Sequence, residues 1–96
     1  MQVKQISREE LAQWQKDGKQ FRLVDVREKH EHLDYNIGGE LIPLSELNRQ
    51  FRPSDSDIPI IFYCRKGIRS QIAIQRLQQK YPQLEFYNLT SGLTVA

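Results

Sequence analysis

The chain has 96 residues, which is the size of one small domain. Hydrophobic residues make up 39% of it and charged residues 27%, a balance typical of a folded globular protein and not of a disordered segment. Fourteen Lys and Arg residues stand against twelve Asp and Glu residues, and the resulting net charge of +2 does not indicate nucleic acid as a partner.

The chain contains one cysteine, Cys64, so it can form no internal disulfide and no zinc site made of several cysteines. Its first residues lack the apolar run of a signal peptide, and no stretch approaches the roughly 18 consecutive apolar residues of a membrane span. We therefore expect a cytoplasmic protein without a membrane partner, in a compartment where a lone thiol stays reduced.

Short apolar runs alternate with helical patterns along the chain, which predicts an α/β domain with a mostly parallel sheet. The first helix begins at a capping box, in which Ser7 caps the helix and Glu10 reaches back to the cap. Ile6 and Leu11 flank this cap with the spacing of a hydrophobic staple. The elements expected here are a strand over residues 3–6 and a helix over residues 8–16.

Residues 58–63 form the most apolar segment, and its unbroken run predicts a central strand that is covered on both faces. Proline cannot donate a hydrogen bond to a sheet, so Pro59 belongs near the start of this strand. We expect Ser45 to cap a helix in which Leu47 and Phe51 share one face. The other expected elements are strands over 21–26, 41–42 and 84–89, helices over 28–33 and 69–81, turns over 36–39 and 91–93, and a polar loop over 52–57.

The segment from Cys64 to Ser70 joins the strongest strand to the strongest helix and reads Cys-Arg-Lys-Gly-Ile-Arg-Ser. In an open α/β sheet, ligands bind where the strands end. A loop at this place can turn its backbone N–H groups inward, and the helix that follows adds the positive end of its dipole. Gly67 supplies the backbone freedom that such a loop needs. The sequence therefore predicts an anion-binding cradle around the cysteine.

A thiol at the floor of this cradle would favour its thiolate form. A free cysteine has a pKa of about 8.5, and comparable settings lower that pKa to roughly 3.5–7.5. No Asp or Glu occurs from Ile58 to Leu84, so we expect a positive local field. The basic residues of this stretch are Arg65, Lys66, Arg69, Arg76 and Lys80. The simplest alternative is a buried, inert cysteine followed by a solvated helix start, but the basic loop with its glycine favours a reactive thiol.

Four segments of the chain resemble the rhodanese family, in the order in which that family has them. They are 23–28 (Leu-Val-Asp-Val-Arg-Glu), 42–47 (Ile-Pro-Leu-Ser-Glu-Leu), the cysteine loop at 62–70, and 87–93 with its Tyr-Asn-Leu and Gly-Leu. The resemblance implies one rhodanese-like domain over residues 1–96, with a three-layer α/β fold and a five-stranded, mostly parallel sheet flanked by helices. Residues 35–40 depart from the family pattern Gly-His-Ile-Pro-Gly-Ala, although Gly38 and Gly39 permit the turn.

The resemblance also implies a sulfurtransferase without a cofactor. It would move sulfane sulfur from a donor such as thiosulfate to a thiol, cyanide or a protein acceptor, through a persulfide on Cys64. Asp25 and Arg27 would support the loop or line the pocket, and an ion pair at a strand end with no catalytic part is equally open. The residues implied to bind the anionic substrate are Arg65, Lys66, Gly67, Ile68, Arg69 and Ser70.

Two other functions stay open at this point. Phosphatases and arsenate reductases use a related cysteine loop, but four residues separate Cys64 from Arg69, one fewer than in that loop, and the tighter loop favours sulfur. A rhodanese-type module could also deliver sulfur to, or dock, a dedicated partner protein. A metal site is not expected, because His30 and His32 are two residues apart on a predicted helix and do not share a face.

Overall fold

The structure is a computed structural model that describes residues 3–53 and 57–94. These residues form a five-stranded parallel sheet in the order β1-β5-β4-β2-β3. The strands are β1 (Lys4–Ile6), β2 (Arg22–Asp25), β3 (Glu40–Leu41), β4 (Ile60–Tyr63) and β5 (Phe86–Leu89). The helices are α1 (Arg8–Lys16), α2 (Lys29–Asp34), the 3-10 helix η1 (Leu44–Glu46), α3 (Leu47–Gln50) and α4 (Ile68–Lys80). The predicted α/β class with a parallel sheet is confirmed, and the loop expected over 52–57 lies partly outside the described residues.

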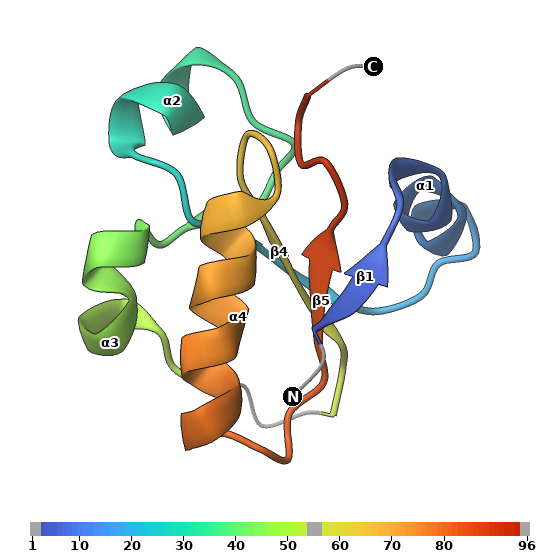
Figure 1. Ribbon diagram of the computed structural model, residues 1–96. Helices are drawn as coiled ribbons and strands as arrows, with labels where there is room; N and C mark the ends of the chain where they lie inside the picture. Colours follow the sequence, from blue (N-terminus) through green and yellow to red (C-terminus); the bar gives the residue numbers. More distant parts are fainter. Residues whose placement is uncertain (1–2, 54–56, 95–96) are drawn as a thin grey trace.

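The central position of β4 is also confirmed, since it pairs with β2 on one side and β5 on the other. All four of its residues are buried, and they alternate between two cores. Ile60 and Phe62 pack with Cys64 in the core under α3 and α4. Ile61 and Tyr63 pack in the core under α1. Figure 1 shows the resulting three layers, with α1 on one side of the sheet and α3 and α4 on the other.

The start of α1 matches the capping box that the sequence predicts. The amide of Glu10 donates to Ser7 Oγ at 3.0 Å, and the amide of Ser7 donates to a carboxylate oxygen of Glu10 at 3.0 Å. Ile6 and Leu11 lie in the same hydrophobic core, as the staple requires. This local pattern fixes the angle at which the chain leaves β1.

The prediction that Ser45 caps a helix is wrong. Ser45 lies inside η1, and α3 begins at Leu47 without a hydrogen bond from any capping side chain. The chain enters this region from Pro43, and the amide of Leu44 donates to the carbonyl of Val26 at 3.1 Å, which starts the tighter 3-10 turn directly at the sheet.

The turn at residues 36–39 lies against the ring of Tyr63. A Cβ on Gly39 would lie 2.7 Å from Tyr63 Cε2, so no larger residue fits this position without a shift. The amide of Ile37 donates to the Tyr63 hydroxyl at 3.4 Å. The turn predicted over these residues is thus present, and it is fitted to the strand that leads into the cysteine loop.

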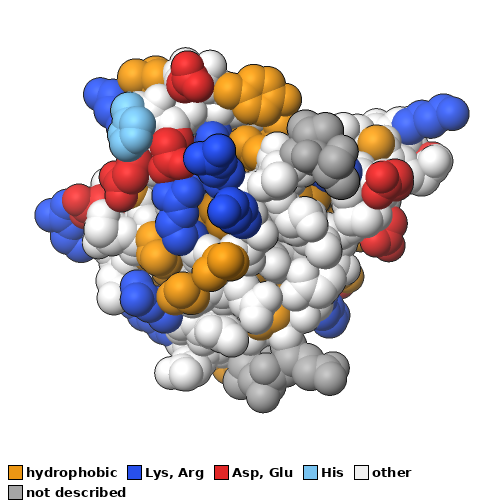
Figure 2. Space-filling view, turned by 45° about the horizontal axis from the view of Figure 1, so that its top comes forward, with side chains coloured by type: hydrophobic (Ala, Val, Ile, Leu, Met, Phe, Trp, Pro, Cys, Tyr) orange, Lys and Arg blue, Asp and Glu red, His pale blue; other side chains and the backbone are white. Residues whose placement is uncertain are grey.

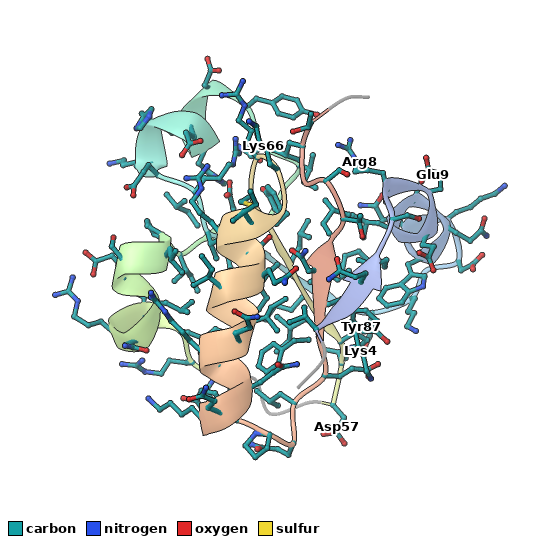
Figure 3. The ribbon with its side chains drawn as sticks, viewed as in Figure 1. Lys4, Arg8, Glu9, Asp57, Lys66 and Tyr87 are labelled. Atoms are coloured by element: carbon teal, nitrogen blue, oxygen red, sulfur yellow. The ribbon has the colours of Figure 1, made fainter. Side chains whose placement is uncertain are left out.

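The parallel register brings the ends of β2 and β4 to one edge of the sheet, because Asp25 lies opposite Tyr63. The cysteine loop follows at this edge, and Figure 3 shows Lys66 there, at the opposite end of the molecule from Asp57. None of the helices in the described part of the chain is long and apolar enough to cross a lipid bilayer.

Candidate active site

Cys64 is the first residue after β4, and the loop it begins turns back on its own sulfur. Gly67 has φ of +87°, a left-handed conformation that favours glycine, and it stands directly before α4. Its amide donates to Cys64 Sγ at 3.0 Å. A Cβ at Gly67 would lie 3.2 Å from the amide nitrogen of Ser91, so the position is also tight in space. The loop therefore presents a backbone N–H group to the sulfur, as an anion cradle requires.

The environment of Cys64 favours the thiolate over the thiol. The side chain is buried, with 1% of the residue exposed. Burial raises the pKa of the thiol, but hydrogen bonds from Ser70 and from the amides of Lys66 and Gly67 outweigh it and hold the pKa below its ordinary value. A thiolate is the form in which cysteine acts as a nucleophile.

Ser70 is fully buried on the first turn of α4, with its hydroxyl oxygen 3.4 Å from Cys64 Sγ. The hydroxyl donates to the side-chain oxygen of Asn88, and the Asn88 amide donates to the carbonyl of Gly67 at 3.1 Å. A hydroxyl has one hydrogen to share between the sulfur and Asn88, so the Gly67 amide gives the firmer support to a thiolate. Asn88 links the serine and the loop to β5.

A pocket of about 320 Å³ opens over the sulfur. Its walls are formed by Cys64, Arg65, Lys66, Ile68 and Arg69. Arg65, Lys66 and Ile68 are exposed, and Figure 2 shows Lys and Arg side chains gathered beside hydrophobic ones on this face of the molecule. The pocket therefore combines two solvent-facing cations with an apolar edge next to a buried thiol.

Arg69 forms an ion pair that the sequence did not indicate. Its guanidinium donates to both carboxylate oxygens of Glu31 on α2, at 2.8 and 3.0 Å. The hydrogen bond with Arg69 lowers the pKa of Glu31 from its ordinary value of 4.5 to about 2. No acidic residue is near Cys64 in the sequence, but folding places the carboxylate of Glu31, 38 residues before Arg69, next to the cysteine loop.

Asp25 and Arg27 form a buried ion pair that holds α2 and does not line the pocket. Arg27 donates to both oxygens of Asp25, at 3.0 and 2.9 Å, and to the carbonyl of Tyr35 beyond the end of α2. His32 Nδ1 lies 2.8 Å from Asp25 Oδ2. Burial raises the pKa of Asp25, but hydrogen bonds from Arg27 and His32 bring it below its ordinary value. The pair thus orients the helix that carries Glu31 to Arg69.

The C-terminal turn braces the cysteine loop from outside, which the sequence did not show. The amide of Leu93 donates to the carbonyl of Cys64 at 3.0 Å, and the amide of Thr94 donates to the carbonyl of Arg65 at 2.9 Å. Gly92 has φ of +55°, and a Cβ there would lie 2.1 Å from the Cys64 carbonyl oxygen. With their carbonyls engaged outside, these loop peptides leave the inner side of the loop to its N–H groups.

Residues 7–95 match the family model of the rhodanese-like domain. The chain belongs to this family. The uncharacterized protein YqhL of Bacillus subtilis is 39% identical over 72 residues, which cover 74% of this chain and 56% of that protein. The adenylyltransferase and sulfurtransferase MOCS3 of Drosophila ananassae is 30% identical over 81 residues, covering 74% of this chain and 18% of that protein. The matched segment of this chain thus spans about half the length of one relative and less than a fifth of the other.

Two solved structures show the same fold at nearly full length. A rhodanese-like domain protein from Staphylococcus aureus superposes with a TM-score of 0.83 at 23% identity, covering 95% of this chain and 88% of that one. A human single-domain sulfurtransferase, TSTD1, superposes with a TM-score of 0.72 at 27% identity, covering 93% and 92%. The predicted rhodanese-like fold is confirmed, and the family membership supports a role of the sulfurtransferase type.

Proposed function

We propose that this rhodanese-like domain is a sulfurtransferase that carries sulfane sulfur as a persulfide on Cys64. The observation that supports this most is the Gly67 amide, aimed at Cys64 Sγ from 3.0 Å at the floor of a pocket that cations line. Such a site stabilises a thiolate before the reaction and a negatively charged persulfide after it. Cytoplasmic placement stays a prediction.

The first half-reaction needs a donor with a sulfur that can be transferred, and thiosulfate is the simplest one. The Cys64 thiolate attacks the outer sulfur of thiosulfate and forms a new S–S bond. The S–S bond of thiosulfate breaks, and sulfite leaves with its electron pair. Charge is conserved, because one anionic sulfur on the protein replaces another. Arg65 and Lys66 attract the donor, and the loop amides hold the new terminal sulfur.

The second half-reaction needs an acceptor from outside the chain, because Cys64 is its one cysteine. Cyanide or a thiolate attacks the outer sulfur of the persulfide. The Cys64 sulfur then leaves as the thiolate, which the Gly67 amide stabilises again, and the product is thiocyanate or a new persulfide. The same amide serves both halves of the cycle, because Cys64 is an anion at the start and the end.

The test is the intact mass of the protein after incubation with thiosulfate. We expect a gain of one sulfur atom, which cyanide or dithiothreitol removes. The Cys64→Ser variant, treated in the same way, should gain nothing. An unmodified mass in the wild type with thiosulfate, and equally with an organic persulfide donor, would contradict the proposal.

A phosphatase activity is the main alternative from the same type of loop. Four residues separate Cys64 from Arg69, one fewer than in the phosphatase loop, and this tighter loop favours one anionic sulfur over a tetrahedral oxyanion. We therefore expect no hydrolysis of an aryl phosphate such as p-nitrophenyl phosphate. Turnover of that substrate that is lost in Cys64→Ser would overturn the assignment.

A protein acceptor is the second candidate, supported by exposed apolar side chains on the two helices next to the pocket. Ile68 and Ile72 on α4 are 64% and 36% exposed, and Leu33 on α2 is 72% exposed. Exposed apolar side chains beside the pocket offer a partner protein a contact surface, which favours delivery of sulfur to a protein thiol. Ile72→Ser should then slow transfer to reduced thioredoxin, used as a model protein thiol, and leave transfer to cyanide unchanged. If Ile72→Ser transferred sulfur to thioredoxin as fast as the wild type does, this candidate would be excluded.

A further inference from the structure

The three cations that line the Cys64 pocket are not equivalent. Arg65 and Lys66 are exposed, whereas Arg69 is partly buried and held by two hydrogen bonds to the carboxylate of Glu31. The side chains of Arg69 and Glu31 are 35% and 22% exposed, so solvent screens this pair less than it screens a surface pair. Arg69 is therefore the cation that the fold holds most firmly beside Cys64, and it is also the one whose charge a carboxylate offsets.

We propose that Glu31 is a specificity-determining residue, whose carboxylate offsets the charge of Arg69 beside Cys64 and so limits how tightly the pocket holds an anion. The proposal deepens the sulfur-transfer function and rests on it for its biological meaning. Glu31 is not among the residues that line the pocket, and it contacts the pocket wall through Arg69, so it acts as a positioning residue.

The position of the Glu31 carboxylate is fixed from several sides. The amide of Glu28 donates to Glu31 Oε1 at 3.0 Å, in the capping box that starts α2. The helix is tied to the sheet through the hydrogen bond between His32 and Asp25, 2.8 Å long. A carboxylate held in this way keeps its place next to the guanidinium, unlike a flexible side chain on a free surface.

Arg69 and Cys64 interact electrostatically. The pKa of Arg69 is raised, first by the hydrogen bond to Glu31 and further by the negative charges of Glu31, the Cys64 thiolate and Glu28. The carboxylate of Glu31 also lies in the field of Arg27. Glu28 and Arg27 are the same residues in the wild type and in a Glu31 variant, so a difference between the two proteins does not come from a change in either of those charges.

Offsetting one cation has a chemical use in a two-step transfer. The pocket must attract an anionic donor, but it must then release an anion such as sulfite and leave the persulfide reactive toward an acceptor. Arg65 and Lys66 already supply attraction at the mouth. A further uncompensated positive charge beside the sulfur would hold the leaving sulfite more tightly and so slow its release.

The test compares two alkylating agents of similar shape, anionic iodoacetate and neutral iodoacetamide, on the wild type and on Glu31→Gln. Glutamine has the size of glutamate and can still accept a hydrogen bond from Arg69. We expect the ratio of the iodoacetate rate to the iodoacetamide rate to rise by roughly three- to tenfold, because one unit of charge near the thiolate is exposed. The rise should shrink in about 0.5 M salt, as a charge effect must.

Glu40→Gln is the matched control. Glu40 makes the same two-fold contact with an arginine, at 3.0 and 2.5 Å from Arg22, at the other end of β2. Its removal should leave the ratio unchanged. Arg69→Gln should move the ratio in the opposite direction, below that of the wild type, and it keeps the proposal testable if Glu31→Gln folds poorly.

Alkylation needs a thiolate but no transfer of sulfur, so the two proposals can fail separately. A protein that gains no sulfur from any donor, yet shows the expected ratios, would lose the sulfurtransferase assignment and keep the role of Glu31. A ratio that is the same in the wild type and Glu31→Gln would overturn the role of Glu31. Loosening of α2 alone would raise both alkylation rates together and leave their ratio unchanged, which would also count against it.

Discussion

Ser70 donates its hydroxyl hydrogen to Asn88, although the same hydroxyl oxygen lies 3.4 Å from the sulfur of Cys64. When Cys64 carries its proton, the S–H group can donate to Ser70, and the chain of hydrogen bonds runs from the sulfur to β5. When Cys64 is a thiolate, its sulfur and the side-chain oxygen of Asn88 compete for the single hydroxyl hydrogen of Ser70. The contact therefore supports the thiolate less than a dedicated amide does.

Ser70→Ala tests this relationship. We expect the pKa of Cys64 to rise by about one unit or less, since a donor to the thiolate is lost but the Gly67 amide remains. The pH dependence of the iodoacetamide rate measures that pKa directly. Ser45→Ala, a change of an exposed serine in η1, should leave the pKa where it is. A rise well above about one unit would show that Ser70, and not the loop backbone, stabilises the thiolate.

Features that depend on neighbours in sequence were predictable. The capping box at Ser7 and the apolar run of β4 are read from residues a few positions apart, and both are present. The need for glycine at position 67 follows from the loop itself. Ser45 shows the limit of such reasoning, because its preference for helix caps lost to a 3-10 turn that starts from the sheet.

The contacts that complete the site were not predictable, because they join residues far apart in the chain. Glu31 reaches Arg69 across 38 residues, and Asn88 reaches Ser70 across 18. Gly92 lies against the carbonyl of Cys64. No local pattern marks these partners, since their approach depends on how α2 and the C-terminal turn pack at the edge of the sheet. The cysteine of the candidate site and its loop could be named from sequence, but the distant partners Glu31, Asn88 and Gly92 could not.

Cys64→Ser should abolish sulfur transfer with little effect on the fold. Serine is close to cysteine in size and can keep a hydrogen bond with the Gly67 amide, so the melting temperature should change by only a few degrees. Thiocyanate formation from thiosulfate and cyanide measures the activity. Residual activity above the uncatalysed rate in a folded variant would refute Cys64 as the carrier.

Lys66→Ala should weaken the use of an anionic donor more than the use of an acceptor. Lys66 lines the pocket and is exposed, so its charge attracts thiosulfate without a partner side chain being disturbed. We expect the KM for thiosulfate to rise by roughly two- to fivefold, with a smaller change in kcat. Lys80→Ala, at the far end of α4, is the control. An equal loss with an uncharged persulfide donor would mean that Lys66 shapes the loop.

Gly92→Ala should destabilise the protein and disturb the loop together. Its Cβ would lie 2.1 Å from the Cys64 carbonyl oxygen and 2.8 Å from the Arg65 carbonyl oxygen, so the turn or the loop must move. We expect a loss of about 2–4 kcal/mol in the free energy of unfolding, measured with urea, and slower alkylation of Cys64. Gly18→Ala separates strain from clash, because Gly18 has φ of +70° but nothing within 4 Å of a Cβ. Similar losses in both variants would show that backbone strain alone accounts for the effect.

The ion pair between Glu31 and Arg69 should make the stability depend on acid. The pKa of Glu31 is about 2 in the folded protein, against an ordinary value of 4.5, so the folded state favours the ionised carboxylate. The stability it contributes is present above pH 4.5 and is lost as the pH falls from there toward about 2. Glu31→Gln has no proton to gain at this position. Its free energy of unfolding should therefore fall less with acid than that of the wild type, and the gap between the two, roughly 1 kcal/mol, should close.

Urea unfolding of both proteins at about pH 7, 4 and 3 measures this gap. The titration of Asp25 is common to both proteins and cancels in the difference, because Glu31 makes no hydrogen bond to that carboxylate. A gap that stays constant down to about pH 3 would mean that Glu31 is not ionised more readily in the folded protein than in the unfolded chain. In that case Glu31 would not offset the charge of Arg69. All three cations of the pocket, and not only Arg65 and Lys66, would then attract an anion.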